Sequence, residues 1–163
     1  MGDSVRFSQS HGILGLTVDG DWNAGFSSDS IDMAKYNHAT LLIIGDSSLA
    51  GNAVITIYGG ATAGAETAAI TFAYRYAGGD VGSASSDVYD AVLTSAALTT
   101  TAGSMDSRVT VIEFEAADLN VSNTQYRYAT VVVSAAGTAG TCSIVAILSE
   151  PRYSEAVMDT AQA

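Results

Sequence analysis

Histidine is the side chain that most often supplies acid–base catalysis or a metal ligand near neutral pH, and this sequence has two, His11 and His38. Neither has a second histidine or a cysteine pair at the spacing that a zinc site requires. The sequence has no Gly-x-Ser-x-Gly elbow, and the glycine-rich stretch 59–64 lacks the Gly-Lys-Ser/Thr ending of a phosphate-binding loop. We therefore expect no catalytic residue, no resident metal and no cofactor. A small hydrolase with an unrecognised site is a third hypothesis, after the two developed below.

Asp19 and Asp21 lie in the one segment whose spacing suggests calcium binding, since Asp-x-Asp-x-Asn begins an EF-hand loop. The sixth position of that loop is Ala24, where a glycine is needed, and the twelfth is Ser30, where a bidentate glutamate belongs. These differences exclude an EF-hand. An acidic turn is the favoured interpretation, and a looser calcium site built on Asp19 and Asp21 is the alternative.

Trp22, the only tryptophan, lies in the same turn. An exposed tryptophan stacks on sugars or anchors an interface, whereas a buried one fills the end of a β-sandwich. We favour packing or contact with a neighbouring subunit over sugar binding. Cys142, the only cysteine, permits no internal disulfide and lies within the apolar run 142–148, so we expect it to be a small hydrophobic residue of the core.

The charge composition argues against nucleic acid and membrane partners. The chain has 17 acidic residues against 6 basic ones, for a net charge of −11. Binding to phosphates depends on clustered lysine and arginine, and here the basic residues form no run. No apolar run approaches the roughly 18 residues of a membrane span. Only 14% of the residues are charged, against about 25% in typical soluble domains, and such a surface suits close packing against neighbours.

The elements that position these residues are predicted to be strands. The hydrophobic runs are short, rich in β-branched residues and separated by Gly, Ser, Asn or Asp. The predicted strands are Ile13–Val18, Ala39–Ile44, Ala53–Tyr58, Ala68–Tyr76, Arg108–Glu115, Tyr126–Ser134 and Thr141–Ser149, with shorter ones near Val5–Ser8 and Val88–Val92. Within the fourth of these, the alternation predicts that the even-numbered side chains from Ile70 to Tyr76 face the core.

Seven to nine short strands joined by small polar turns indicate an all-β fold, an antiparallel β-sandwich or jelly roll with minimal helix. A short helix is expected within 27–37, with Asp29 or Ser30 as its cap, and a single helical turn at Ala116–Leu119. At 163 residues the chain fits one domain. We divide it into an N-terminal arm (1–10), a β-sandwich domain (11–150) and a C-terminal tail (151–163).

Two segments of the chain resemble each other, Tyr36–Ile43 and Tyr126–Val133. Each is followed by a turn of small residues and another apolar strand. The pattern indicates either a duplicated hairpin or two strands of similar composition.

Four stretches that span most of the chain carry a family resemblance, namely Ile31–Ala39, Ala69–Arg75, Val109–Leu119 and Ala146–Tyr153. In pattern and composition the chain resembles a group of small virion proteins of tailed bacteriophages, usually regarded as head decoration or cement proteins. The resemblance implies a β-rich, non-enzymatic protein that binds the outer surface of a phage head and stabilises it. A tail or neck component of the virion fits the same resemblance.

The resemblance also implies the partners. They are the major capsid protein of the shell and further copies of this chain, in a homo-oligomer that we expect to be a trimer. The first six residues have neither the basic segment nor the apolar stretch of a signal peptide, as expected for a virion protein made in the host cytoplasm. The acidic charge suits an outward position on the head better than contact with packaged DNA.

The residues that we expect to make these contacts are large apolar or aromatic side chains. They are Val5 and Phe7 in the N-terminal arm, Trp22 in the sandwich, and Tyr153 and Val157 in the C-terminal tail. An arm that buries such side chains on a neighbour adds contact area beyond the globular footprint. The alternative from another class is a carbohydrate-binding β-sandwich that uses Trp22 and nearby tyrosines.

Overall fold

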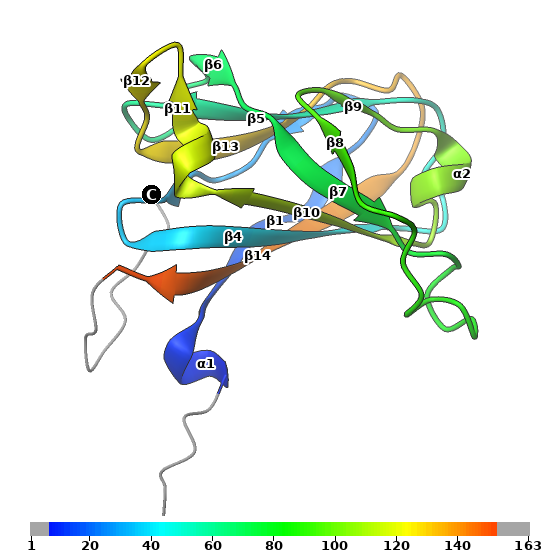
Figure 1. The fold of residues 1–163 in the computed structure, drawn as a ribbon. Helices are drawn as coiled ribbons and strands as arrows, with labels where there is room; N and C mark the ends of the chain where they lie inside the picture. Colours follow the sequence, from blue (N-terminus) through cyan, green and yellow to red (C-terminus); the bar gives the residue numbers. More distant parts are fainter. Residues whose placement is uncertain (1–6, 153–163) are drawn as a thin grey trace, which may run out of the picture.

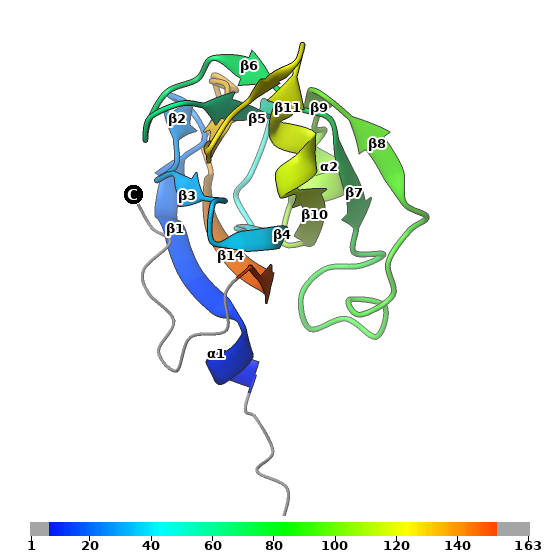
Figure 2. The same ribbon diagram turned by 60° about the vertical axis from the view of Figure 1, so that its left-hand side comes forward.

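A computed structural model describes residues 7–152 of the chain. Two antiparallel sheets pack face to face, with the hydrophobic core between them and short helical turns at their margins (Figures 1 and 2). Strands account for 51% of the structure and helix for 7%. The predicted all-β antiparallel sandwich with minimal helix is therefore confirmed.

The first sheet has six strands, and every neighbouring pair in it is antiparallel. In spatial order they are β1 (Gly12–Asp21), β14 (Thr141–Pro151), β4 (Tyr36–Gly45), β10 (Val109–Glu115), β7 (Phe72–Tyr76) and β8 (Leu93–Ser95). The long strands of this sheet correspond to predicted ones, each shifted by a few residues at its ends.

The second sheet is built on two long strands and four very short ones. In spatial order it contains β2 (Phe26–Ser27), β13 (Tyr128–Val133), β5 (Val54–Gly60) and β6 (Ala68–Ala69), while β3 (Ile31–Asp32) also pairs with β13 and β9 (Leu98–Thr99) with β5. Outside the two sheets lie the hairpin β11 (Asn120–Val121) with β12 (Thr124–Gln125), the helical turns α1 (Phe7–Ser10) and α2 (Ala102–Met105), and the 3₁₀ turn η1 (Ala116–Leu119).

Alternation along the strands places one face of each sheet in the core. On β4, Leu41 and Ile43 are fully buried, while the intervening Leu42 and the following Ile44 are on the other face. On β14, which pairs with β4, the buried residues are likewise every second one, among them Ile144. The sequence thus forms a sandwich because apolar side chains recur at every second position on each long strand.

The stretch 68–76, predicted as one strand, is divided between the two sheets. β6 pairs with β5 in the second sheet, whereas β7 pairs with β10 in the first. At the corner between them the backbone N–H of Ile70 donates to the carbonyl of Ile57 at 2.9 Å. Ile70 and Phe72 are buried, and Tyr74 packs against the core. The predicted inward face is confirmed, and the predicted continuity of the strand is wrong.

The short helix predicted within 27–37 is also wrong, because this segment runs along β13. The backbone N–H of Ser28 donates to the carbonyl of Val131 at 2.8 Å, and that of Met33 donates to the carbonyl of Arg127 at 3.0 Å. These partners are about 100 residues away in sequence, and the bonds to them replace those that a helix would make within itself.

Three smaller elements were predicted with mixed success. Residues 7–8 belong to the helical turn α1 rather than to a strand, and residues 5–6 lie outside the described part of the chain. Of the strand predicted at Val88–Val92, the described structure retains one isolated bridge between Ala77 and Tyr89. The helical turn predicted at Ala116–Leu119 is confirmed as η1, where a carboxylate oxygen of Asp118 accepts the N–H of Glu115 at 2.7 Å.

Trp22 lies inside the sandwich. Its side chain is fully buried, and its indole N–H donates to the carbonyl of Ala50 at 3.0 Å. The burial leaves no aromatic face for a neighbouring subunit or a sugar. Of the roles predicted for Trp22, packing is the one that fits. The prediction that Trp22 makes interface contacts is wrong, because its side chain is buried.

Asp46 joins the end of β4 to the start of β14. One of its carboxylate oxygens accepts the N–H and the hydroxyl of Thr141, at 3.0 and 2.6 Å, and the other accepts the N–H and the hydroxyl of Ser48. These hydrogen bonds, with that from the Thr141 hydroxyl the largest contribution, lower the pKa of Asp46 from 3.8 to about 2. The ionised carboxylate therefore stabilises the junction.

We expect Trp22→Ala to lower the free energy of unfolding by about 3–5 kcal/mol, because a large cavity would remain and the Ala50 carbonyl would keep only the hydroxyl of Thr138 as a donor. Val18→Ala is the control, since Val18 is 78% exposed and its truncation should change the free energy by less than about 0.5 kcal/mol. Urea unfolding followed by circular dichroism measures both. Equal unfolding midpoints for the two variants would contradict the burial of Trp22.

We expect the protein to lose stability as the pH falls from about 4 toward 2. A carboxyl whose pKa is lowered on folding stabilises the fold above its ordinary pKa, and the contribution disappears as the folded group is protonated. Asp46→Asn should lower the unfolding free energy at pH 7 by about 1 kcal/mol and flatten its dependence on pH in this window. Urea unfolding at a series of pH values measures both effects, and an unchanged slope in Asp46→Asn would contradict the assignment.

Candidate interaction surface

The face of the first sheet that points away from the core carries a group of aliphatic side chains. We call it the outer-face patch, and it consists of Ile13, Leu42, Ile44, Val109, Val145 and Ile147. Residues directly opposite each other on antiparallel strands point to the same face. The register places Leu42 opposite Val145, Ile44 opposite Val109, and Ile147 opposite Ile13. Four adjacent strands, β1, β14, β4 and β10, therefore contribute to one surface.

The patch is partly open to solvent. Ile13 is 53% exposed and Ile44 is 39% exposed, while the other four members are half-buried by their neighbours on the sheet. Soluble β-proteins usually place polar side chains on the outward face of such strands. The apolar face is thus a feature that packing within the described chain does not explain.

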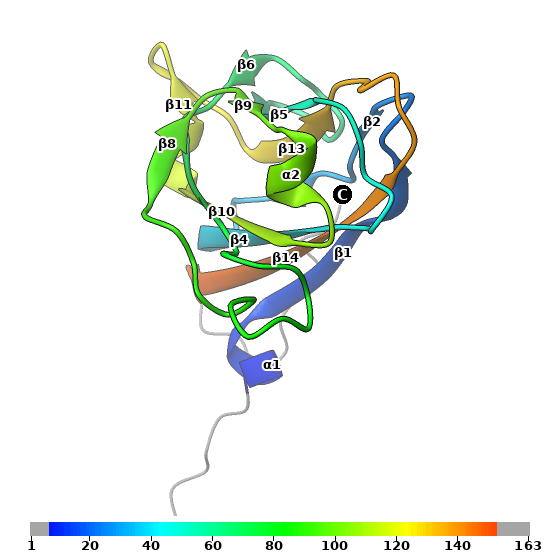
Figure 3. The same cartoon turned by 90° about the vertical axis from the view of Figure 1, so that its right-hand side faces the viewer.

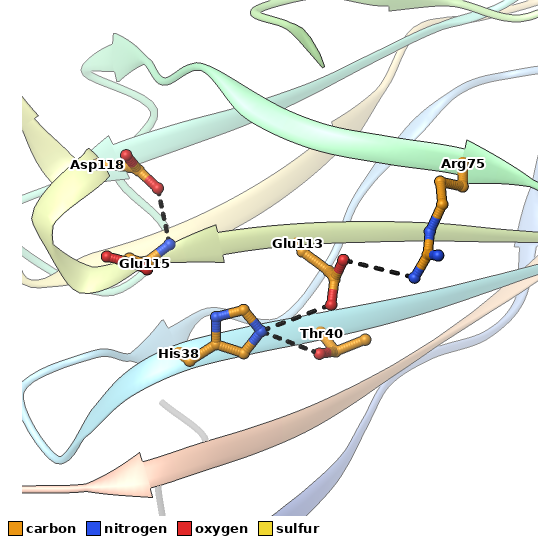
Figure 4. A network of polar contacts seen from close by, with 6 residues as sticks. All are labelled: His38, Thr40, Arg75, Glu113, Glu115 and Asp118. Atoms are coloured by element: carbon orange, nitrogen blue, oxygen red, sulfur yellow. Dashed lines mark hydrogen bonds and ion pairs between the residues drawn. The ribbon is translucent and has the colours of Figure 1, made fainter. Parts of the chain in front are cut away.

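A cluster of polar side chains borders the patch on the same face (Figure 4). Nε2 of His38 lies 3.3 Å from the hydroxyl of Thr40 and 3.7 Å from a carboxylate oxygen of Glu113. The other carboxylate oxygen of Glu113 lies 3.8 Å from a guanidinium nitrogen of Arg75. These side chains come from β4, β10 and β7, which the pairing of Glu113 with Thr40 and Ala73 brings side by side.

The geometry of this cluster does not suit a hydroxyl–histidine–carboxylate relay. Such a relay uses the two imidazole nitrogens for two different partners, whereas Nε2 of His38 faces both Thr40 and Glu113. The distance of 3.7 Å to Glu113 also exceeds that of a hydrogen bond. The cluster is therefore a set of weak polar contacts on a sheet surface, with little effect on stability.

A long loop, residues 77–92, connects β7 to β8 and exposes further apolar side chains. Val81, Val88 and Val92 are each more than half exposed, and Leu93 at the start of β8 is 51% exposed. The loop is held at its base, where the N–H of Gly78 donates to the carbonyl of Val88 at 2.6 Å. Loops of this length without secondary structure usually have a function, often in binding.

The loop and α1 project from the sandwich to the same side. In Figures 1, 2 and 3 both lie below the first sheet, on the side away from the second sheet. The outer-face patch belongs to the sheet face that points in this direction. The open sheet face is thus flanked by α1 at its β1 edge and by the loop beyond β7.

The structure describes two of the five predicted interface residues. Phe7 on α1 is 53% exposed, and its ring stacks on that of His11 with the ring centres 4.0 Å apart. Phe7 therefore remains a contact candidate, and Trp22 does not because it is buried. Val5, Tyr153 and Val157 lie outside the described residues.

The other residues singled out in the sequence have local structural roles. A carboxylate oxygen of Asp21 accepts the N–H groups of Asn23 and Ala24 at 2.9 and 3.3 Å, as in an acidic turn. Among residues 7–152 no group of three or more His, Cys, Asp or Glu side chains is placed to hold a metal ion. Cys142 is buried, and burial raises the pKa of its thiol to about 12.

Sequence reasoning did not identify the patch and the loop as contact surfaces, because the apolar pattern of each strand was considered separately. The signal was present in the uninterrupted apolar run Leu41–Ile44 and in Val109–Ile112, since strands that are covered on both faces have near-continuous apolar sequences. A two-layer sandwich covers one face of each strand. The opposite face of such a run is then a candidate contact surface.

No protein-family model matches this sequence, and no curated protein matches it significantly. None of the helical segments among residues 7–152 has the length and apolarity that crossing a membrane requires.

We expect the double substitution Leu42→Thr with Ile44→Thr to change the unfolding free energy by less than about 1 kcal/mol, because both side chains are partly exposed and threonine is a good strand former. The variant should also elute earlier from a hydrophobic-interaction column. Leu41→Thr on the same strand is the matched control, and since Leu41 is fully buried it should destabilise the fold by several kcal/mol. A double variant as unstable as the control would show that the patch is part of a packed core.

Proposed function

We propose that this chain is a non-enzymatic structural protein of a tailed-phage virion, a decoration or cement protein that binds the outer surface of the head and stabilises it. The proposal rests on the resemblance carried by the four stretches of the sequence and on the outer-face patch. Its partners would be the major capsid protein and other copies of the chain, in a homo-oligomer for which a trimer is favoured.

The observation that carries the proposal is the apolar outer face of the first sheet. Leu42 and Ile44 on β4, with Val145 and Ile147 on β14, form an apolar surface that the described chain leaves partly open to solvent. Burying aliphatic surface of this kind against a partner is favourable, by roughly 25 cal/mol for each Å² removed from water. A protein whose role is to adhere to an assembled shell needs such a surface and needs no catalytic cluster.

The carbohydrate-binding alternative used an exposed Trp22 together with nearby tyrosines. The burial of the Trp22 ring and its hydrogen bond to Ala50 remove the tryptophan from any platform on which a sugar would stack. A tail or neck position in the virion fits the same resemblance and would use the same kind of apolar contact surface, and the particle composition measured below decides between these positions and the head.

We expect purified particles of the encoding phage to contain the chain at a fixed ratio to the major capsid protein, and shells assembled without it to bind added protein. The bound shells should resist heat or denaturant better than bare shells, because a ligand that binds the assembled state stabilises it. Quantitative mass spectrometry and co-sedimentation measure these outcomes. Particles that lack the chain, or that carry it only in the tail, would contradict the head assignment.

A further inference from the structure

We propose that the outer-face patch and the loop 77–92 form one contact surface, and that its partner is a shell surface with an apolar centre and a rim of lysine or arginine rather than a second copy of this chain. This inference rests on the proposed function and adds to it the binding face and the chemistry of the partner.

The first step is that the patch and the loop are continuous. Arg75 on β7 lies opposite Val111, which is the neighbour of Leu42 on the outer face. The Arg75 guanidinium carbon lies 5.5 Å from the ring centre of Tyr89 in the loop. The bridge between Ala77 and Tyr89 fixes this part of the loop beside the sheet. A partner that covers the sheet face therefore also meets the loop that projects beside it (Figure 3).

The second step is the size of the surface. Neighbouring strands lie about 4.8 Å apart and rise about 3.3 Å per residue, so the six strands of the first sheet span about 24 Å across, and their lengths of 3 to 11 residues average about 25 Å. A specific interface typically buries about 800 Å² on each partner. The sheet face and the adjoining loop together approach that area.

The third step is the charge around the apolar centre. The carboxylates on this side are Glu113 and Glu115 on β10 and Asp80, Asp87 and Asp90 in the loop. The arginines are Arg75, which is near Glu113, and Arg108, whose Nε donates to Asp80 at 3.1 Å. Among the described residues Glu115, Asp87 and Asp90 have no ion-pair partner. The surface is thus apolar over β1, β14 and β4 and acidic on the side of β10 and the loop.

This charge distribution decides between the two candidate partners, a shell surface and a second copy of this chain. A second copy placed face to face on this surface would bring the same excess of carboxylates against itself. Like charges across an interface oppose association, whereas complementary charges speed and strengthen it. A shell surface with basic residues around an apolar centre therefore fits, and a second copy of this chain does not.

The test uses phage shells assembled without this chain and compares variants of the full chain by co-sedimentation. Leu42→Asp adds a charge at the apolar centre and should weaken binding more than tenfold. Thr124→Asp adds the same charge on the exposed hairpin β11–β12 and should change binding less than twofold. Circular dichroism and urea unfolding check that both variants fold. Equal binding by the two folded variants would overturn the assignment of the face.

The rim is tested by charge reversal and salt. Asp87→Lys should weaken binding by about 3- to 10-fold, whereas Glu66→Lys, the same charge change in the exposed loop that precedes β6, should change it less than twofold. Binding of the wild-type chain should weaken from about 0.1 to 1 M NaCl, over which the Debye length falls from about 10 to about 3 Å. Binding that is unaffected by Asp87→Lys and by salt would overturn the basic rim.

The second copy is tested in the same preparations by sedimentation equilibrium. If Leu42→Asp abolishes self-association and leaves shell binding intact, the partner of this face is a second copy. That result would overturn the inference while the proposed function stands. Wild-type chain that fails to bind shells at all would overturn the proposed function and this inference together.

Discussion

The pairing of β4 with β14 is the constraint on which the rest of the structure depends. It joins residues 36–45 to residues 141–151 in one register, from Cys142 opposite Gly45 to Pro151 opposite Tyr36. β1 attaches to the sheet only through β14, and β10 connects β4 to β7 and β8. A shift by one residue would turn the core side chains of β4 to the outside and its outer side chains to the core. Asp46 holds this register, because its carboxylate accepts both the N–H and the hydroxyl of Thr141 at the start of β14.

Much of the fold could be predicted because the long strands carry their own signal. β-branched runs with inward positions at every second residue identify β4, β5, β10, β13 and β14 from local sequence alone. The corner at Ile70 could not be predicted, since the alternation continues through it while the strand changes sheets. The segment after β2 was misassigned because its serines and aspartates suit a helix cap, but the partner that decides its structure is β13, which lies far away in sequence. For the contact surface, the sequence locates the strands and does not specify which of their two faces the chain itself covers.

The internal similarity between Tyr36–Ile43 and Tyr126–Val133 has a structural counterpart, although of the two interpretations left open the duplicated hairpin does not fit, since neither segment forms a hairpin with the strand that follows it. β4 is followed by β5 in the opposite sheet, and β13 is followed by β14 in the opposite sheet. β4 then pairs with β14, and β13 pairs with β5. The two similar segments thus occupy corresponding places, one near the middle of each sheet, and each is joined by a crossing connection to the partner of the other.

The outward faces of these two corresponding strands differ, and the difference supports an external partner for one of them. On β13 the outward Thr130 is buried, because its hydroxyl is hydrogen-bonded at 2.7 Å to that of Ser30, which also accepts the N–H of Gly64. The chain therefore covers Thr130 with its own segments, which satisfy its hydroxyl, whereas the outward Val132 is only half-buried. On β4 the outward Leu42 and Ile44 are aliphatic and no described segment buries them. An aliphatic side chain cannot form a hydrogen bond with a covering segment, and its burial is favourable only because it leaves water. The presence of Leu42 and Ile44 at these positions therefore points to an apolar partner from outside the described chain.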